Sequence, residues 1–145
     1  MSELLQFERN IEQATAAFFA EKGIEATPTR EATNLGTDSM QVVFDYNGAM
    51  EETRQHRSGA LEYDSHSGVL MILVMTYRDS PTRHLERIGK VRQNLLNSNH
   101  GLTAANYKFI DIQPLGSTTN ESEETNQDTT TLQYEIKFSI NLRSI

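Results

Sequence analysis

The chain has 145 residues, no cysteine and a formal net charge of -7, and 37% of its residues are hydrophobic. This length is typical of one domain with its own core. The lack of cysteine excludes disulfides, thiolate metal sites and a thiol nucleophile, and the acidic charge argues against extensive binding of nucleic acid. The longest apolar run, Val69 to Met75, is far shorter than the roughly 20 residues of a membrane helix, and the N-terminus lacks the order of a signal peptide, so we expect a soluble intracellular protein.

An amphipathic helix is predicted near the N-terminus. Apolar residues recur there at three- and four-residue spacing, with charged residues between them: Leu4, Phe7, Ile11, Ala14 and Phe18. Gly23 is suited to end this helix, because glycine readily adopts the left-handed conformation that follows many helices. Residues 24–39 show no sustained period and are predicted to connect the helix to a sheet.

Three strands are predicted between residues 40 and 76. Apolar and polar residues alternate from Met40 to Tyr46, and the Asn47-Gly48 pair that follows is a strong turn signal. Leu61 to Asp64 alternate again, and the segment Ser65 to Gly68 predicts a tight turn before a strand from Val69 to Thr76. Because this last strand is apolar at nearly every position, we expect it at the centre of the sheet with both of its faces covered.

A second amphipathic helix is predicted from about Pro81 to Asn97. Ser80 can cap its first turn, and proline suits the first helical position because its missing N–H costs nothing there. The expected apolar stripe is Leu85, Ile88, Val91, Leu95 and Leu96.

The remaining residues predict two strands joined by a loop. A strand from Tyr107 to Ile112 is expected to end at Pro114 and Gly116. Residues 117–130 are acidic, rich in Ser, Thr and Asn and without an apolar residue, so they predict a solvated, mobile loop. Strict alternation then predicts a strand from Thr129 to Leu142 whose apolar face is Leu132, Tyr134, Ile136, Phe138, Ile140 and Leu142.

The length of the last predicted strand has a consequence of its own. It would extend on the order of 45 Å, whereas a compact chain of this size has a radius of gyration of only about 15 Å. The strand must therefore bend or reach a neighbouring molecule. Together the elements define an α+β fold, a mostly antiparallel sheet of about four to five strands flanked by two amphipathic helices, in a single domain over residues 1–145 with the mobile acidic loop at about 117–130.

No catalytic, cofactor or metal site is predicted. The four histidines share no metal-ligand spacing and are expected at the surface: His56, His66, His84 and His100. The sequence has no glycine-rich phosphate loop and no serine in a nucleophile elbow. The carboxylates between residues 51 and 64 precede a strand without the lysine or carboxylate of a metal-dependent nuclease. We therefore expect no enzyme activity and no cofactor.

Charged residues of opposite sign gather in the second helix and in the acidic loop. They are either an ordinary solvated helix face with its surroundings or complementary patches that orient neighbouring copies. A groove for nucleic acid is a weaker reading, because no aromatic residues interleave with the arginines to stack bases. The subunit-interface candidates are Arg83, Arg87, Lys90, Arg92, Glu121, Glu123, Glu124 and Asp128.

Three segments, taken in order after the N-terminal helix, carry a family resemblance. They are Gly68-Val69-Leu70-Met71-Ile72-Leu73-Val74 with Arg78 after it, Arg83-His84-Leu85-Glu86-Arg87-Ile88, and Leu132-Gln133-Tyr134-Glu135-Ile136-Lys137-Phe138. In this arrangement the chain resembles the tail terminator and tail-completion proteins of tailed bacteriophages. The resemblance covers most of the chain, and it is one of architecture without a diagnostic motif.

The resemblance implies a structural virion protein of the tail or neck, assembled in the host cytoplasm. Members of that family form rings, commonly hexamers, that end the tail tube. The implied partners are therefore other copies of the chain, the tail-tube protein and the head-side connector protein. DNA would only pass through the lumen, and no membrane is involved. A head–tail connector or a tail-tube subunit is the nearest alternative. A monomeric intracellular ligand-binding module or small enzyme is the alternative of a different class.

Overall fold

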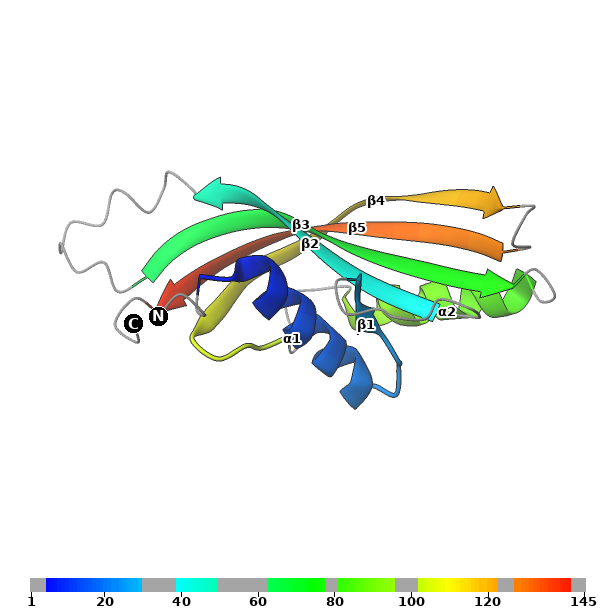
Figure 1. Cartoon of the computed structure of the whole chain (residues 1–145), viewed down its shortest axis with the longest axis horizontal. Coiled ribbons are helices and arrows are strands. Elements are labelled where there is room, and N and C mark those ends of the chain that lie inside the picture. The colour runs from blue at the N-terminus through cyan, green and yellow to red at the C-terminus, as the bar shows by residue number, and fades with distance from the viewer. Residues whose placement is uncertain are drawn as a thin grey trace.

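A five-stranded sheet runs along the length of the molecule (Figure 1). The computed structural model describes residues 5–29, 39–49, 63–77, 81–95, 102–122 and 127–141. In chain order the strands are β1 (Thr27–Pro28), β2 (Ser39–Ala49), β3 (Tyr63–Tyr77), β4 (Tyr107–Ser122) and β5 (Gln127–Asn141). They lie in the order β1-β2-β3-β5-β4, with β1 parallel to β2 and every other pair antiparallel. The predicted α+β class with a mostly antiparallel sheet is confirmed.

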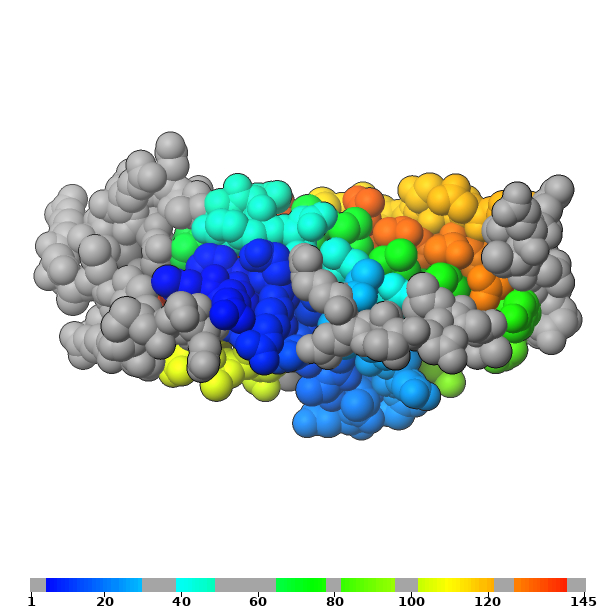
Figure 2. Space-filling model, in the orientation of Figure 1, coloured from blue at the N-terminus to red at the C-terminus, as the bar shows by residue number. Residues whose placement is uncertain are grey.

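Both helices, α1 (Phe7–Glu21) and α2 (Pro81–Asn94), cover the same face of the sheet (Figure 1). The Phe7 ring of α1 contacts the Phe138 ring, with 5.5 Å between centroids. His84 of α2 makes a hydrogen bond to Thr130. Residues 130 and 138 are an even number of positions apart on β5, so their side chains point to the same face. In the space-filling view α1 lies over one part of this face, and β4 and β5 extend beyond it (Figure 2).

The C-terminus of α1 is fixed by backbone hydrogen bonds that the sequence allowed us to expect. Gly23 has a φ of 77°, in the left-handed region. Its N–H donates to the carbonyl of Ala20, and the N–H of Ile24 donates to the carbonyl of Phe19. This is the Schellman arrangement, and Phe19 and Ile24 are both buried, which supplies the apolar contact that accompanies it.

The core lies between the helices and one face of the sheet, and β3 is the central strand as predicted. Leu70, Ile72 and Val74 of β3 are fully buried beneath the helices. The prediction that both faces of this strand are covered is wrong within the described part of the chain. The alternate residues are only partly buried, and no described helix lies over them: Val69, Met71, Leu73 and Met75.

The turn predicted at Ser65 to Gly68 is also wrong, because these residues continue β3 without interruption. Gly68 is needed for close approach rather than for a turn: a Cβ at this position would lie 2.2 Å from Cζ of Phe44. The Asn47-Gly48 pair does not close a hairpin either. It lies within β2, where the register with β3 shifts between Tyr46 and Gly48, so it forms a β-bulge.

β4 continues through Pro114 and Gly116, which were expected to end it. Its register with β5 shifts at Ile110 and again at Leu115, so each of these is an extra residue in a bulge. An edge strand tolerates such bulges and a proline, because one side of it makes no ladder hydrogen bonds. The residues predicted as a loop at 117–130 mostly belong to strands, with 117–122 in β4 and 127–130 in β5. Residues 123–126 lie outside the described residues, and the mobility of the acidic segment stays a prediction.

The long last strand neither folds back nor needs a neighbour for pairing. β5 pairs with β3 from Gln127 to Asn141 and with β4 over nearly the same length. The sheet spans the long axis of an elongated molecule (Figure 1). The estimate from a compact globule failed because the other long strands extend with β5.

Candidate assembly surface

A buried polar cluster joins α2 to the sheet. The Nδ1 atom of His84 lies 2.8 Å from Oγ1 of Thr76 on β3, and its Nε2 atom lies 2.8 Å from Oγ1 of Thr130 on β5. Thr130 in turn lies 2.9 Å from the hydroxyl of Thr119 on β4. Burial lowers the pKa of His84; the charge of Asp128 raises it and that of Arg87 lowers it further. The histidine therefore acts as a neutral connector of three strands to one helix.

The prediction that His84 lies at the surface is wrong. The face of α2 that points toward the sheet includes position 84 and not position 85. The inward stripe of α2 is His84, Ile88, Val91 and Leu95, whereas Leu85 is 68% exposed. A spacing of four, three and four residues was readable in the sequence, but histidine was not counted as an inward residue. His66 is buried as well, and His56 and His100 lie outside the described residues.

Arg87, one of the predicted interface residues, points into the subunit. Its Nη1 atom donates to the carbonyl of Met75 and to Oγ1 of Thr76, both at 2.6 Å, and its Nη2 donates to the carbonyl of Ser39 at 3.2 Å. These contacts join α2 to neighbouring ends of β2 and β3. Burial, followed by the nearby charge of Arg83, lowers the pKa of Arg87. Its guanidinium is thus engaged within its own chain.

The other predicted interface residues are divided between the helix and the end of the β4–β5 hairpin. Arg83, Lys90 and Arg92 are exposed on α2. Glu121 and Asp128 are directly paired across β4 and β5, and Glu123 and Glu124 lie outside the described residues. Asp128 acts on the pKa of His84, so the basic helix and the acidic hairpin end are neighbours within one subunit. Their role between subunits stays a prediction.

A second cluster, made of aromatic rings, lies beneath α1 at the other end of the same face. The His66 ring stacks on Phe138 with 5.4 Å between centroids and is 4.8 Å from the Phe7 ring. Its Nδ1 atom lies 2.6 Å from the hydroxyl of Tyr46. The Tyr107 ring also stacks on Phe138, with 5.6 Å between centroids. These side chains pack the core beneath α1.

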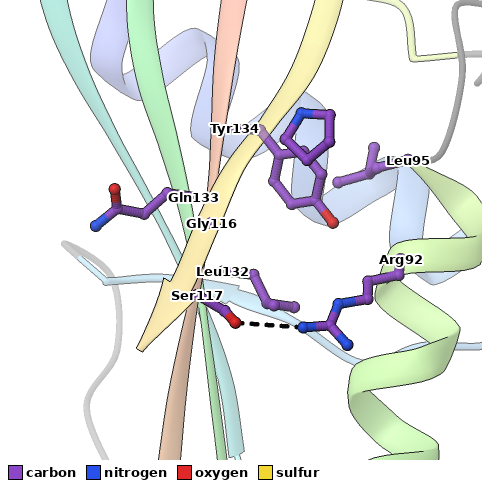
Figure 3. A pocket seen from close by; sticks show the side chains of 8 residues that line it. Arg92, Leu95, Gly116, Ser117, Leu132, Gln133 and Tyr134 are labelled. Carbon is purple, nitrogen blue, oxygen red and sulfur yellow. Dashed lines mark hydrogen bonds between the residues drawn. The ribbon is translucent and has the colours of Figure 1, made fainter. Parts of the chain in front are cut away.

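A pocket of about 280 Å³ lies between α2 and the β4–β5 part of the sheet (Figure 3). Leu95, Leu132 and Tyr134 give it an apolar interior, and Arg92 and Ser117 lie at one side, where Nη2 of Arg92 donates to the serine hydroxyl at 3.3 Å. Burial raises the pKa of Tyr134, and the charge of Arg92 opposes this. The hydroxyl of Tyr134 points toward the Arg92 side of the pocket (Figure 3).

The face of the sheet away from the helices carries an apolar band. It consists of Val43 on β2 and four residues of β3, all partly exposed: Val69, Met71, Leu73 and Met75. β5 contributes polar residues beside it, such as Thr131, Gln133 and Glu135. A contiguous apolar patch that is rimmed by polar residues is typical of a surface that meets another molecule.

The described residues contain no group of three His, Asp or Glu side chains placed to hold a metal ion. Neither described helix is long and apolar enough to span a membrane. The described surface features are the apolar band, the edge of β4 and the pocket beside it.

The fold defines an α+β protein in which both described helices cover one sheet face and no described helix covers the other. No family model matches the sequence, and no curated protein sequence matches it. A solved structure described as the virion of a native gene transfer agent (GTA) particle contains a chain of similar fold. The two chains superpose with a TM-score of 0.63 at 12% sequence identity, over 90% of this chain and 92% of that chain. At this identity the likeness shows a shared fold.

Proposed function

We propose that this chain is a structural, non-enzymatic protein of a phage-like virion. The observation that carries the proposal is the match to a chain of the gene transfer agent particle, which extends over 90% of this chain and 92% of the other. A likeness over both whole lengths is stronger support than a shared supersecondary motif, although fold alone does not define function. The apolar band on the open sheet face supports the same proposal, because an assembly subunit needs surface that another molecule covers.

Within the virion we propose a role in the tail or neck, as a ring that ends the tail tube and joins it to the head-side connector. The support is the resemblance of the ordered segments to tail terminator and tail-completion proteins. Subunits of a ring meet through two different surfaces, one on each side. The apolar band on β2 and β3 is a candidate for one of these surfaces. DNA would pass through the lumen and would not be a stable partner.

Deletion of the gene tests both levels of the proposal. In cells that produce the particle, we expect the deletion to yield tail tubes longer than normal and detached from heads, as measured by negative-stain electron microscopy. Tubes of normal length beside tailless heads would instead identify a connector, and a complete absence of tubes would identify a tube subunit. Intact, infectious or DNA-transferring particles would refute a structural role in the virion.

Mass measurement of the purified chain gives a second, independent readout. We expect a ring-sized species by native mass spectrometry, alone or after addition of tail tubes. A chain that stays monomeric in both conditions would favour the ligand-binding module.

A further inference from the structure

The outer edge of β4 is available to another strand. β4 is the last strand in the sheet order, and no described strand lies beyond it. Residues 113–121 of β4 are all exposed. An unpaired edge presents a row of N–H and C=O groups that can pair with another chain, and proteins usually protect such edges with prolines, bulges or lysines.

The features that discourage pairing of this edge with another strand lie only in its first half. Both bulges and Pro114 lie between residues 109 and 116. From Ser117 to Ser122 the pairing with β5 is regular, and the segment contains neither proline nor lysine. The second half of the edge is therefore competent to accept a strand.

The two bulges also place apolar side chains in solvent. Ile110 is 50% exposed and Leu115 is 53% exposed. A bulge redirects a side chain that regular pairing would assign to one face. Leu115 thus lies next to the segment 117–122 that an incoming strand would pair with, and Ile110 lies farther back along β4.

The pocket lies at the second bulge and shares residues with the edge. Pro114, Gly116 and Ser117 of β4 line it together with Leu95, which directly follows α2. Figure 3 labels Gly116, Ser117 and Leu95 in this lining. Its volume of about 280 Å³ is just below the roughly 300–1,000 Å³ of typical small-molecule sites. A space of this size suits one large side chain better than a whole cofactor.

The charge beside the pocket limits the partner further. Arg92 is exposed at its side. A carboxylate on the partner would find complementary charge here, whereas a basic partner would be repelled. Strand addition with side-chain pockets is an established mode of peptide recognition.

We propose that the β4 edge and this pocket form a docking site for an extended segment of another protein. The segment adds a sixth strand beside β4, inserts one large apolar side chain into the pocket and places a carboxylate near Arg92. This inference does not depend on the ring role, because it rests on the edge, the pocket and the charge alone. Pairing of β4 with a second copy of this chain is the competing outcome.

The test begins with selection from a random heptapeptide library displayed on a carrier, with the full chain immobilised. We expect the selected peptides to share one large apolar residue near an Asp or Glu. A synthetic peptide of the selected sequence should slow amide hydrogen exchange in the second half of the β4 edge, at residues 117–121. Selected sequences without this pattern, or unchanged exchange in β4, would overturn the proposal.

Charge reversal supplies the matched comparison. Arg92→Glu should weaken peptide binding by about tenfold or more, and replacing the acidic residue of the peptide by lysine should restore binding to this variant. Lys90→Glu makes the same charge change on the same helix away from the pocket lining, and it should change affinity much less. An equal loss of peptide affinity in both variants would mean that general electrostatic attraction, and not a contact at Arg92, explains the effect. That result would refute the site. A chain that dimerises in solution and becomes monomeric on Leu115→Glu would assign the edge to a second copy instead.

Discussion

Both helices bury apolar residues against one sheet face, but stacked rings are concentrated beneath α1 and side-chain hydrogen bonds to several strands beneath α2. Beneath α1, rings pack against one another around Phe138, with Phe7, His66 and Tyr107 all within 5.6 Å between centroids. Beneath α2, hydrogen bonds from His84 and Arg87 reach several strands. Burial of apolar area is non-directional, whereas hydrogen bonds require fixed geometry. The α1 end should therefore dominate stability, while the α2 end fixes the position of its helix and leaves space for a pocket.

The largest expected effect is at the α1 end. Phe138→Ala should lower the free energy of unfolding by about 3–5 kcal/mol, the usual cost of removing a buried aromatic side chain. Urea denaturation at constant pH measures it. Leu115→Ala, at an exposed position of the same sheet, should remain within about 0.5 kcal/mol of the parent chain. Similar losses in the two variants would mean that the aromatic cluster is not the centre of the core.

A smaller loss of unfolding free energy is expected when hydrogen bonds beneath α2 are removed. Arg87→Met keeps most of the aliphatic stem and removes the donors to Met75, Thr76 and Ser39, and it should cost about 1.5–3 kcal/mol. Lys90→Met on the exposed side of α2 is the control and should stay within about 0.5 kcal/mol. Both values come from the same denaturation experiment. A loss from Arg87→Met as small as that of the control would return Arg87 to the list of residues free to contact a neighbour.

Substitution of two glycines by alanine, one in the sheet and one in α2, compares the space around the backbone in the two elements. Gly68→Ala brings a Cβ into the Phe44 ring and the carbonyl of Asp45, so it should destabilise the chain by about 1–3 kcal/mol. Gly89 of α2 has open space around its Cβ position, so Gly89→Ala should stabilise by about 0.5–1 kcal/mol, because alanine is the better helix former. Thermal denaturation of the two variants measures both signs. The same sign for both changes would contradict the packing around Gly68.

These positions also explain how far the sequence alone could lead. The alternation of β5 correctly predicted its buried face, from Leu132 to Ile140. Strict alternation of apolar and polar residues is characteristic of a strand with one buried face, so the pattern identified both the element and its buried side. The 3.6-residue period likewise predicted α1 and most of α2. Where a segment is regularly periodic, the local pattern determines which secondary structure it forms, and tertiary contacts determine only which elements it packs against.

Local turn signals failed where tertiary pairing overrode them. Gly68 and the Asn47-Gly48 pair were interpreted as turns, but their glycines serve a close approach and a bulge between the long strands β2 and β3. The pocket was missed for a related reason. Its lining comes from α2, β4 and β5, and a bulge at Leu115 that no sequence pattern announces shapes one side of it.

The smallest predicted effect concerns pH and separates the two ends most directly. The folded chain holds His84 with a lowered pKa, mainly through burial, so the unfolded chain binds a proton there more readily. Stability rises with pH wherever the unfolded state binds more protons. The contribution of His84 is therefore complete above the ordinary histidine pKa of about 6.5 and is lost as the pH falls below it.

His84→Gln removes this titration while keeping a side chain that can hydrogen-bond to Thr76 and Thr130. We expect its unfolding free energy to fall less between pH 7.5 and pH 5.5 than that of the parent chain, measured by urea denaturation across this interval. All carboxylates and the other three histidines are common to both chains, so the difference between the two slopes belongs to His84. Parallel slopes would mean that His84 binds a proton equally well in the folded and the unfolded chain, which would contradict its role as a buried connector.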